Sequence, residues 1–363
     1  MKSRARFCLF VGILGLFASG ALAARVLYAF EGDPTAFVAF GRDASELTEY
    51  GEQQLGRPVV ERADLGHDGK FYFALANDPW LTDPDTHASV LDRPRYRAQR
   101  ILYPVIASLG GLLDPARVVW GLLIVNVIAM GLGTWAVATL AADMGGSPLW
   151  GLAYVLNVGF VSEQNIDGAG VVAAAAVFAA IVMVRRGRLG LGIALLAAGA
   201  LAREAMLVGA AGTALWLWRK GRPRDATWAL LVPVGAVTVW AAYVRFRLGF
   251  GGDVSEIQEI GWPLVGVARA FELWLDDPVD FAVGVSILAL LILFTRRAFG
   301  SKELIGWGFL GFVPLALLFS RQVWASYFDI SRAVAPLITA FLLLVFIRSE
   351  PDRALEIHRS GDT

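Results

Sequence analysis

The chain has 363 residues, of which 56% are hydrophobic and only 18% are charged, and its mean hydropathy is +0.58. A composition this apolar excludes an ordinary soluble domain and predicts a protein that spans a membrane several times. The 32 basic and 32 acidic residues cancel, so the charge does not indicate nucleic acid as a partner. The single cysteine excludes a disulfide framework and a cysteine metal site within the chain, and three scattered histidines argue against a histidine metal cluster.

The N-terminal residues 1–26 have two interpretations. A basic head precedes an apolar run, and Ala21 to Ala23 form the small-residue pattern of a cleavable secretory signal. The alternative is an uncleaved first transmembrane helix, a signal-anchor. We favour the helix because more apolar segments follow, and in either case the next segment is delivered out of the cytoplasm.

Further apolar runs of helical length predict an all-α, polytopic transmembrane bundle of about 10–11 helices. The runs lie at about 101–115, 118–142, 148–161, 169–184, 189–202, 204–218, 226–246, 279–295, 303–320 and 333–348. Some are shorter than the ~20 residues that a straight helix needs to cross a bilayer. Helices that tilt or break around a cavity would account for them.

Short, strongly basic segments predict which connections face the cytoplasm. They are residues 1–6, 185–188, 218–224, 295–302 and 348–353. The positive-inside rule then places residues 203–204, 247–278 and 320–332 on the outer side. The predicted division is a first helix at 1–26, an extracytoplasmic loop at 27–100, a helical bundle at 101–348 and a cytoplasmic tail at 349–363. Function is therefore expected on the outer side, where the long connections lie.

One stretch does not fit this alternation. Residue 143 is predicted outside and residue 185 inside, yet two apolar runs separate them, with the polar insert 162–170 in between. We expect residues 148–161 to dip into the membrane and return, which leaves Glu163, Asn165 and Asp167 near the outer surface. A full extra crossing is the alternative.

The stretch "GHDGKFYFALANDPW", residues 66–80, is the first candidate site. A carboxylate such as Asp68, set among aromatic rings in a partly desolvated cleft, can have a raised pKa and accept a proton. Gly66 and Gly69 permit a sharp turn and a close approach of a ligand to the backbone. The alternative is an interfacial turn in which Asp68 caps a helix that begins near Lys70.

The stretch "RPRYRAQRILYP", residues 93–104, is the second. In one continuous helix Arg93, Arg97 and Arg100 fall at i, i+4 and i+7 and share a face. Arginines on one stripe at the outer boundary suit a phosphate or diphosphate, which they bind with paired N–H groups. Alternatively they extend toward lipid headgroups.

Charged residues also stand at two later outer ends. Arg203 and Glu204 lie between two apolar runs, either as an ion pair at a tight corner or as part of a site. Arg332 begins an apolar run and can pair with Asp329 at i, i+3 or bind an anion at the helix N-terminus. A carboxylate at this surface could deprotonate an acceptor hydroxyl, and the arginines at the helix ends could hold a departing phosphate.

The layout resembles the GT-C fold integral-membrane glycosyltransferases. More narrowly, "GHDGKFYFALANDP", "YRAQRILYP" and "REAML" resemble the GYDGQFYY-type bacterial membrane proteins associated with cell-surface glycopolymers. The resemblance covers nearly the whole chain in layout but rests on these three motifs. It implies a polyprenyl-phosphate-linked sugar as donor, an active site outside the cytoplasm of a bacterial plasma membrane, and Asp68 as base. His67 replaces the usual Tyr of the motif, so a role for that neighbour does not carry over.

The function expected from these observations is an inverting, polyprenyl-phosphate-sugar-dependent glycosyltransferase that acts on a cell-envelope glycan or lipid. Asp68 is the expected base, and Asp64, Asp78 and Glu163 are further candidate acids. The expected phosphate ligands are Arg97, Arg100, Arg203 and Arg332, with supporting roles for His67, Lys70, Tyr72, Glu204 and Trp324; Tyr72 and Trp324 would stack against sugar. No cofactor or metal is implied, although some GT-C relatives use a divalent ion.

Two other classes of function remain open. A carrier or flippase for a lipid-linked saccharide would also need outer arginines and a membrane cavity, but we see no internal duplication of the kind that transporters show. A non-catalytic scaffold in a glycopolymer assembly complex requires that Asp68 be dispensable.

Overall fold

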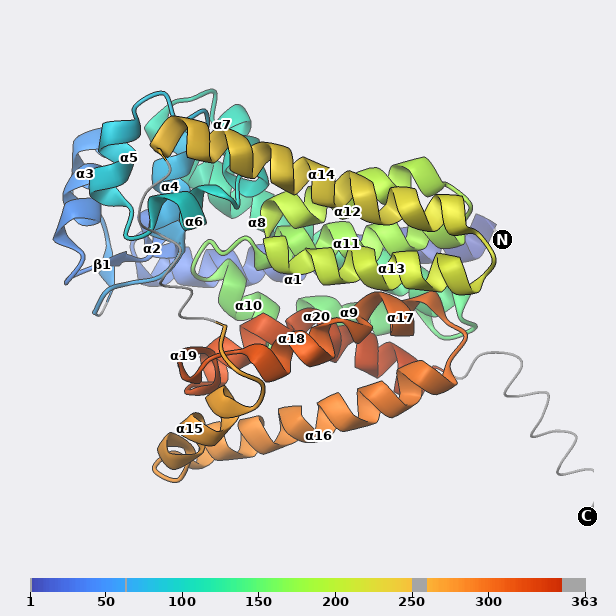
Figure 1. Cartoon of the computed structure of the whole chain (residues 1–363). Coiled ribbons are helices and arrows are strands. Elements are labelled where there is room, and N and C mark those ends of the chain that lie inside the picture. The colour runs from blue at the N-terminus through green and yellow to red at the C-terminus, as the bar shows by residue number, and fades with distance from the viewer. Residues whose placement is uncertain (1, 63, 250–259, 348–363) are drawn as a thin grey trace, which may run out of the picture.

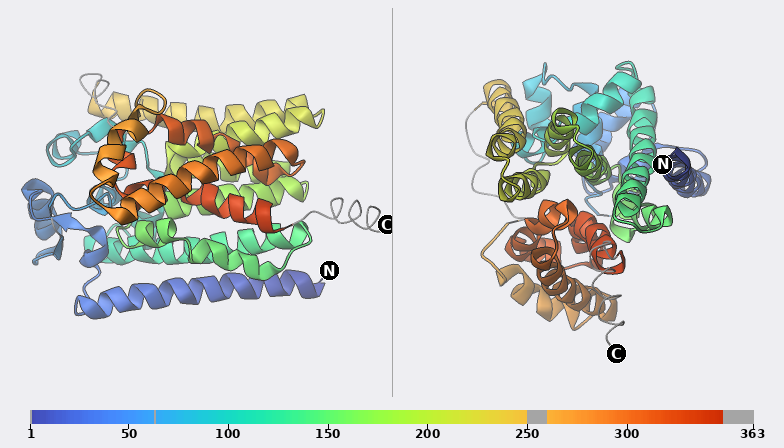
Figure 2. Two further views of the ribbon diagram at one scale, coloured as in Figure 1. Left: turned by 90° about the horizontal axis from the view of Figure 1, so that it is seen from below. Right: turned by 90° about the vertical axis from the view of Figure 1, so that its right-hand side faces the viewer.

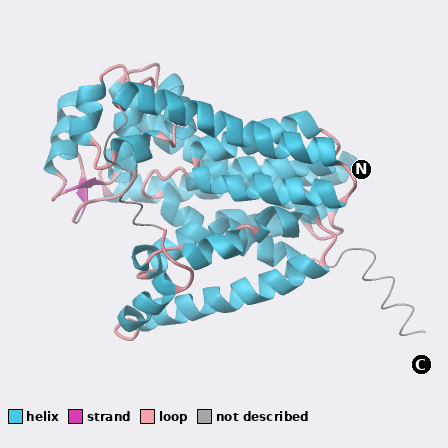
Figure 3. Ribbon diagram, viewed as in Figure 1, coloured by secondary structure: helices cyan, strands magenta, loops and turns pink. Residues whose placement is uncertain are grey.

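The structure, a computed structural model, describes residues 2–62, 64–249 and 260–347. Helix makes up 77% of it (Figure 3), which confirms the predicted all-α class. One short parallel ladder pairs β1 (Phe40–Gly41) with β2 (Glu61–Arg62). Both strands belong to the segment that follows the first helix.

Five of the described helices are long and apolar enough to cross a membrane. They are α1 (Lys2–Ala29), α8 (Pro115–Asp143), α14 (Pro223–Leu248), α16 (Pro278–Gly300) and α20 (Tyr327–Phe346). Beside them run shorter apolar helices: α11 (Gly170–Arg185), α12 (Leu189–Ala202), α13 (Leu207–Arg219), α17 (Leu304–Leu310) and α18 (Phe312–Leu318). Their axes follow the same general direction (Figures 1 and 2), as expected of a bundle that shares one apolar layer.

Residues 30–62 and 64–110 fold into a compact group of short helices at one end of the bundle (Figure 1). These are α2 (Thr35–Val38), α3 (Ser45–Leu55), α4 (Gly69–Asn77), α5 (Pro84–Val90), α6 (Pro94–Ala98) and α7 (Leu102–Gly110). The rings of Phe40 and Tyr50 meet Phe73 edge-on, with centroids 5.7 and 6.3 Å from it. This aromatic packing holds α4 between β1 and α3, and α4 in turn carries the "GHDGKF" motif at its start.

The same end receives the turns of the C-terminal half. η2 (Glu204–Met206) forms the corner between α12 and α13, and α15 (Val265–Trp274) and α19 (Arg321–Trp324) precede α16 and α20. Arg247, at the end of α14, donates from Nε to the carbonyl of Leu81 at 2.9 Å. We call this end of the bundle the loop end.

The basic connections among the described residues gather at the opposite end, together with the start of α1 (Figure 1). The predicted basic segment 348–353 and the predicted tail 349–363 lie outside the described residues. Arg4 donates to the carbonyl of Gly146 at 2.9 Å, and Asp143 pairs with Arg186 at 3.2 Å. Glu303 forms an ion pair with Arg185. We call this the basic end, and its composition matches the connections predicted to be cytoplasmic.

These contacts correct the predicted path between residues 101 and 185. Residues 143 and 185 were expected on opposite sides, but Asp143 and Arg186 touch. The error lies in the run 101–115, which was expected to be a crossing. The helix there, α7, has nine residues and is about 14 Å long, too short to cross ~30 Å of hydrocarbon.

The expected re-entrant dip at 148–161 is also wrong. This segment runs from the basic end to the loop end as η1 (Pro148–Gly151), α9 (Leu152–Val155) and α10 (Val158–Gln164). Gln164 exchanges hydrogen bonds with Ser19, which lies about 22 Å along α1 from Arg4. Glu163, Asn165 and Asp167 nevertheless lie at the loop end, which is the end that was expected to face outward.

Close packing of α1 on α8 depends on glycine. A Cβ at Gly15 would come within 2.4 Å of Thr134 Oγ1, and one at Gly12 within 2.6 Å of Trp135 Cβ. Small residues allow helix axes to approach within an apolar layer, where van der Waals contact replaces the hydrophobic effect. The first helix is thereby packed along the bundle.

Cysteine labelling tests the two ends. In a Cys8→Ala background, Ser147→Cys and Arg188→Cys should react with a membrane-impermeant maleimide from the same side, and Ser89→Cys only from the other. All three positions are exposed, so access depends on the side alone. Labelling of Ser147→Cys and Arg188→Cys from opposite faces of sealed vesicles would contradict the path described here.

Candidate functional site

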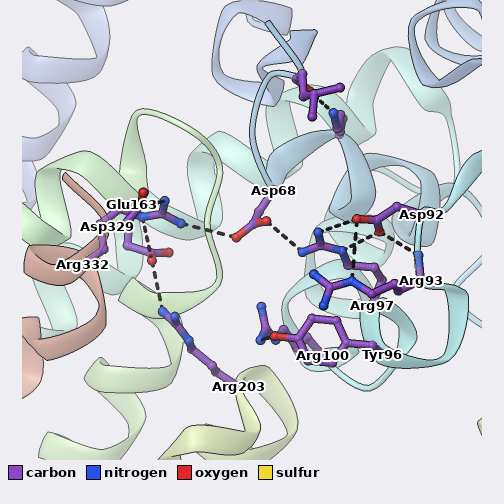
Figure 4. Close-up of polar contacts among 12 residues, drawn as sticks. Asp68, Asp92, Arg93, Tyr96, Arg97, Arg100, Glu163, Arg203, Asp329 and Arg332 are labelled. Carbon is purple, nitrogen blue, oxygen red and sulfur yellow. Dashed lines mark hydrogen bonds and ion pairs between the residues drawn. The ribbon is translucent and has the colours of Figure 1, made fainter. Parts of the chain in front are cut away.

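An alternating chain of acidic and basic side chains occupies the loop end (Figure 4). Its order is Asp92, Arg97, Asp68, Arg332, Glu163 and Arg203, with neighbours in contact at 2.9 to 3.3 Å. The members come from the start of α4, from the α5–α6 region, and from α10, the α12–η2 corner and α20. Segments far apart in sequence therefore meet at one charged site.

Asp68 is the centre of this chain. Its Oδ1 accepts from Arg97 Nη1 at 2.9 Å and its Oδ2 from Arg332 Nη2 at 3.3 Å. It precedes α4 but makes no side-chain capping bond, so the helix-cap interpretation of Asp68 is wrong.

The backbone around Asp68 explains why the motif contains glycines. Gly66 has a φ of +66°, where other residues are strained. A Cβ at Gly69 would lie 2.6 Å from the carbonyl oxygens of Val38 and Ile166. The start of α4 is thus pressed against two other segments, which fixes the position from which Asp68 extends.

Burial by itself raises the pKa of the Asp68 carboxyl, but the guanidinium groups outweigh it. Arg97 and Arg332 are the main causes, followed by Arg100 and Arg203, and together they hold the pKa well below its usual range. The raised pKa expected from the aromatic surroundings is therefore absent. Paired in this way, Asp68 is ionised and only weakly basic.

The single continuous helix predicted from Arg93 is wrong, because α6 ends at Ala98. The guanidinium groups of Arg93, Arg97 and Arg100 nevertheless all lie over the ring of Tyr96, at 4.7, 5.6 and 4.7 Å from its centroid. Arg97 binds Asp92 through Nε and Nη2, both at 2.9 Å, and lies 3.9 Å over the ring of Phe71. Its side chain is 11% exposed. That burial and those partners do not fit an arginine extended toward lipid headgroups.

Arg100 and Glu204 form a separate pair beside the chain. Arg100 donates from Nε and Nη2 to the two carboxylate oxygens of Glu204, at 3.0 and 2.8 Å, and also to the hydroxyl of Tyr96. The predicted pairing of Glu204 with its neighbour Arg203 is wrong. The carboxylate of Glu204 instead orients Arg100, which comes from the segment after α6.

Glu163 is buried at the centre of the ion pairs, although the sequence suggested it only as a further candidate acid. It is 2% exposed and accepts from Arg203 Nη1 and Arg332 Nε, both at 3.1 Å. The backbone N–H of Gly170, at the start of α11, donates to it at 3.0 Å. A Cβ at Gly168 would overlap this carboxylate, so the loop before α11 is wrapped around it. The sequence feature that points to Glu163 is the polar insert 162–170, which separates two apolar runs.

Arg332 joins both halves of the cluster. It contacts Glu163 through Nε, Asp68 through Nη2 and Asp329 through Nη1, the last at 3.2 Å. The local i, i+3 pair was expected, and the two distant carboxylates are added to it. All three edges of the guanidinium are therefore engaged.

Of the supporting residues, only His67 stands at an exposed position of the cluster. Its ring lies 5.2 Å from that of Phe328, over which Arg332 also sits. Lys70 points away and donates to the carbonyl of Leu65.

Tyr72 and Trp324 are wrong as sugar-stacking walls. Tyr72 is 4% exposed and packs edge-on against Tyr103, and Trp324 is fully buried and donates to the carbonyl of Ala316. Neither ring has an open face. Asp78, a further candidate acid, is occupied by Thr82, the N–H of Asp83 and His87.

An apolar groove of about 580 Å³ runs along α14 beside the site. Its lining is mostly aromatic and aliphatic: Trp80, Ile101, Leu201, Gly235, Ala236, Val239, Trp240 and Tyr243. Ile101 follows Arg100 directly, and Leu201 stands two positions before Arg203. The groove thus adjoins the segments that carry two of the arginines.

Within the described ranges, no group of three or more His, Cys, Asp or Glu side chains is placed to hold a metal ion. Comparison of the chain with protein-family models, with curated proteins and with solved structures gave no match. The function is therefore inferred from the geometry and chemistry of the site.

The buried position of Glu163 predicts a large effect on stability. Glu163→Ala leaves Arg203 and Arg332 without a buried counter-charge, and loss of one partner of a buried pair destabilises by about 3–5 kcal/mol. Asp329→Ala removes the more exposed partner of Arg332 and should change stability by about 1 kcal/mol or less. The midpoints of thermal unfolding are measured for both purified variants in detergent. Equal unfolding midpoints for the two variants would show that Glu163 does not anchor the cluster.

Proposed function

We propose that this protein is a polytopic, GT-C type membrane glycosyltransferase that transfers a sugar from a polyprenyl-phosphate donor to a cell-envelope glycan or lipid. The observation that carries the proposal is the carboxylate of Asp68, held between Arg97 and Arg332 at 2.9 and 3.3 Å. A proton acceptor and groups that bind phosphate are thereby brought within contact distance of one another.

The position of the cluster supports an active site outside the cytoplasm. The cluster lies at the loop end, opposite the end that collects Arg4, Arg185 and Arg186. Short basic connections favour the cytoplasmic face of a bacterial plasma membrane. The loop end then faces outward, where polyprenyl-linked sugars would meet their acceptor.

The proposed reaction uses the two kinds of charge in different roles. The acceptor oxygen attacks the anomeric carbon and forms the new C–O bond while its proton moves to Asp68. The bond from the anomeric carbon to the phosphate oxygen breaks, and its electron pair leaves with the phosphate. Arg97 and Arg332 stabilise that negative charge, and attack from the face opposite the phosphate inverts the anomeric configuration.

The apolar groove along α14 supports a donor that carries a lipid. Its walls offer hydrocarbon and aromatic surface next to Ile101 and Leu201, which adjoin the arginine-bearing segments. A chain lying there would keep its phosphate near the loop end. The resemblance in "GHDGKFYF" and "YRAQRILYP" supports the same class of enzyme, since Asp68, Arg97 and Arg100 of these motifs meet in the cluster or beside it.

Replacement of the proposed base tests the reaction. Asp68→Asn should lower turnover by about 10²–10⁴-fold, the usual contribution of a general base. Purified protein is assayed with a panel of radiolabelled polyprenyl-phosphate sugars and an envelope-lipid acceptor, with Asp43→Asn, an exposed acid of the same loop, as control. Unchanged turnover in Asp68→Asn would place the base elsewhere. Movement of saccharide lipid in proteoliposomes, with no turnover of any donor, would instead indicate a carrier.

Replacement of the arginines tests donor binding. Arg97→Ala and Arg332→Ala should each weaken binding of the polyprenyl-phosphate sugar by about ten- to a hundredfold, because a charge-assisted hydrogen bond is lost. Arg57→Ala is the matched control, since Arg57 pairs with Asp33 in the same loop region but outside the cluster. Dissociation constants are measured on monodisperse protein. Wild-type affinity in both cluster variants would rule out their phosphate role.

A further inference from the structure

Two guanidinium groups at the loop end direct one N–H group each toward a common point. Nη1 of Arg97 and Nη2 of Arg332 converge there from opposite sides, and the carboxylate of Asp68 occupies the point (Figure 4). Convergent guanidinium N–H groups are the usual way in which proteins bind a carboxylate or a phosphate. An anion-binding position therefore exists, and an oxygen pair of the chain itself fills it.

The two arginines are held in place without Asp68. Arg97 uses its remaining donors on Asp92, through Nε and Nη2. Arg332 uses Nε on the buried Glu163 and Nη1 on Asp329. Because each guanidinium keeps at least one other carboxylate, the convergent geometry would persist if Asp68 left.

Asp68 is held less firmly than these other partners. Each of its oxygens has one side-chain partner, and its side chain is 27% exposed, whereas that of Glu163 is 2% exposed. Its carboxylate does not cap α4. The side chain can therefore rotate away without undoing the helix.

We propose that the point between Arg97 and Arg332 is the binding site for the donor's phosphate group, that Asp68 occupies it in the absence of ligand, and that an arriving phosphate displaces Asp68. The identity of the ligand as a lipid-borne phosphate rests on the proposed function. Of the four arginines expected from the sequence to bind phosphate, the proposed site uses Arg97 and Arg332. Arg100 is committed to Glu204 and Tyr96, and Arg203 contacts Glu163 through Nη1.

Displacement would also prepare the base. In the ligand-free protein the guanidinium groups keep the pKa of Asp68 low against the effect of burial. Once the negative charge of a phosphate offsets Arg97 and Arg332, the main cause of the low pKa of the carboxyl is removed, and the pKa rises. The other charged or titratable groups that interact with it are Arg100, Arg203, Glu163, Asp329, Lys70 and the neighbouring His67. Arg100 stays paired with Glu204, and Arg203 with Glu163. Asp68 thus becomes an effective proton acceptor when the donor is bound.

Competition between Asp68 and phosphate predicts an unusual gain of affinity on mutation. Farnesyl phosphate is titrated into detergent-solubilised wild type and Asp68→Asn, with inorganic phosphate and farnesol as separate arms. Asp68→Asn should bind farnesyl phosphate about tenfold more tightly, as expected when one competing contact of ordinary strength is removed. Farnesol should show no gain. An equal gain with inorganic phosphate would assign the site to a free anion and overturn the lipid-borne ligand.

A matched variant separates direct competition from a general increase in positive charge. Asp329→Asn also removes one negative charge beside Arg332, at 3.2 Å, but its carboxylate is not at the convergence point. It should leave the affinity for farnesyl phosphate within about twofold of wild type, because only a diffuse electrostatic effect remains. Equal gains in Asp329→Asn and Asp68→Asn, or no gain in Asp68→Asn, would overturn the proposal.

Chemical labelling of the wild-type protein tests the displacement of Asp68 even if a variant does not fold. A hydrophobic carbodiimide modifies protonated carboxyl groups, so Asp68 should be protected when paired and should react several-fold faster when farnesyl phosphate is bound. Peptide mass spectrometry follows Asp68 and, as an internal reference, Glu163. Unchanged labelling of Asp68 would refute displacement. These readouts require no sugar transfer, so a lack of transferase activity would contradict the proposed function and leave the displacement result intact.

Discussion

A carboxylate removed from water requires cationic partners, and Glu163 meets this requirement from two distant parts of the chain. Arg203 comes from the α12–η2 corner and Arg332 from α20, while the start of α11 adds a backbone donor. This one buried group therefore connects the C-terminal helices to the rest of the bundle at the loop end. The remaining site depends on it, because the orientation of Arg332 defines where Asp68 is bound.

The cluster contains carboxylates of two physical kinds. Glu163 is enclosed by a loop that leaves no space even for a Cβ at Gly168, so its carboxylate is held in place by packing as well as by its ion pairs. Asp68 is partly exposed and bridges two arginines that have other partners. In the function we propose, the first kind maintains geometry and the second exchanges with substrate. One site can then bind a phosphate and also supply a base, although the phosphate and the Asp68 carboxylate bind the same two arginines, Arg97 and Arg332.

Several features followed from local pattern. Apolar runs identified α8 and α11 to α14 to within about three residues, because helix length and hydropathy are properties of contiguous sequence. The runs 279–295 and 333–348 also identified α16 and α20, but α16 ends at Gly300 and α20 begins at Tyr327. The run 101–115 misled, since its apolar residues in α7 pack on α4 and α8 and do not span a layer. Tyr72 and Trp324 misled for a related reason. An aromatic ring in a loop region can face solvent or pack into a core, and the local sequence does not distinguish these two positions.

By itself, the sequence determined a predominantly helical chain with apolar helices long enough to cross a membrane, and it predicted basic connections at one end and acids and arginines at the other. Those properties depend on composition and on neighbours within a few positions. The tertiary structure decided which charges meet: Asp68 contacts a residue 264 positions away, and Arg203 and Glu204 each turn to distant partners and away from each other. The spacing of residues in a helix predicts contacts only at i+3 and i+4, and ion pairs between segments follow from how the helices pack.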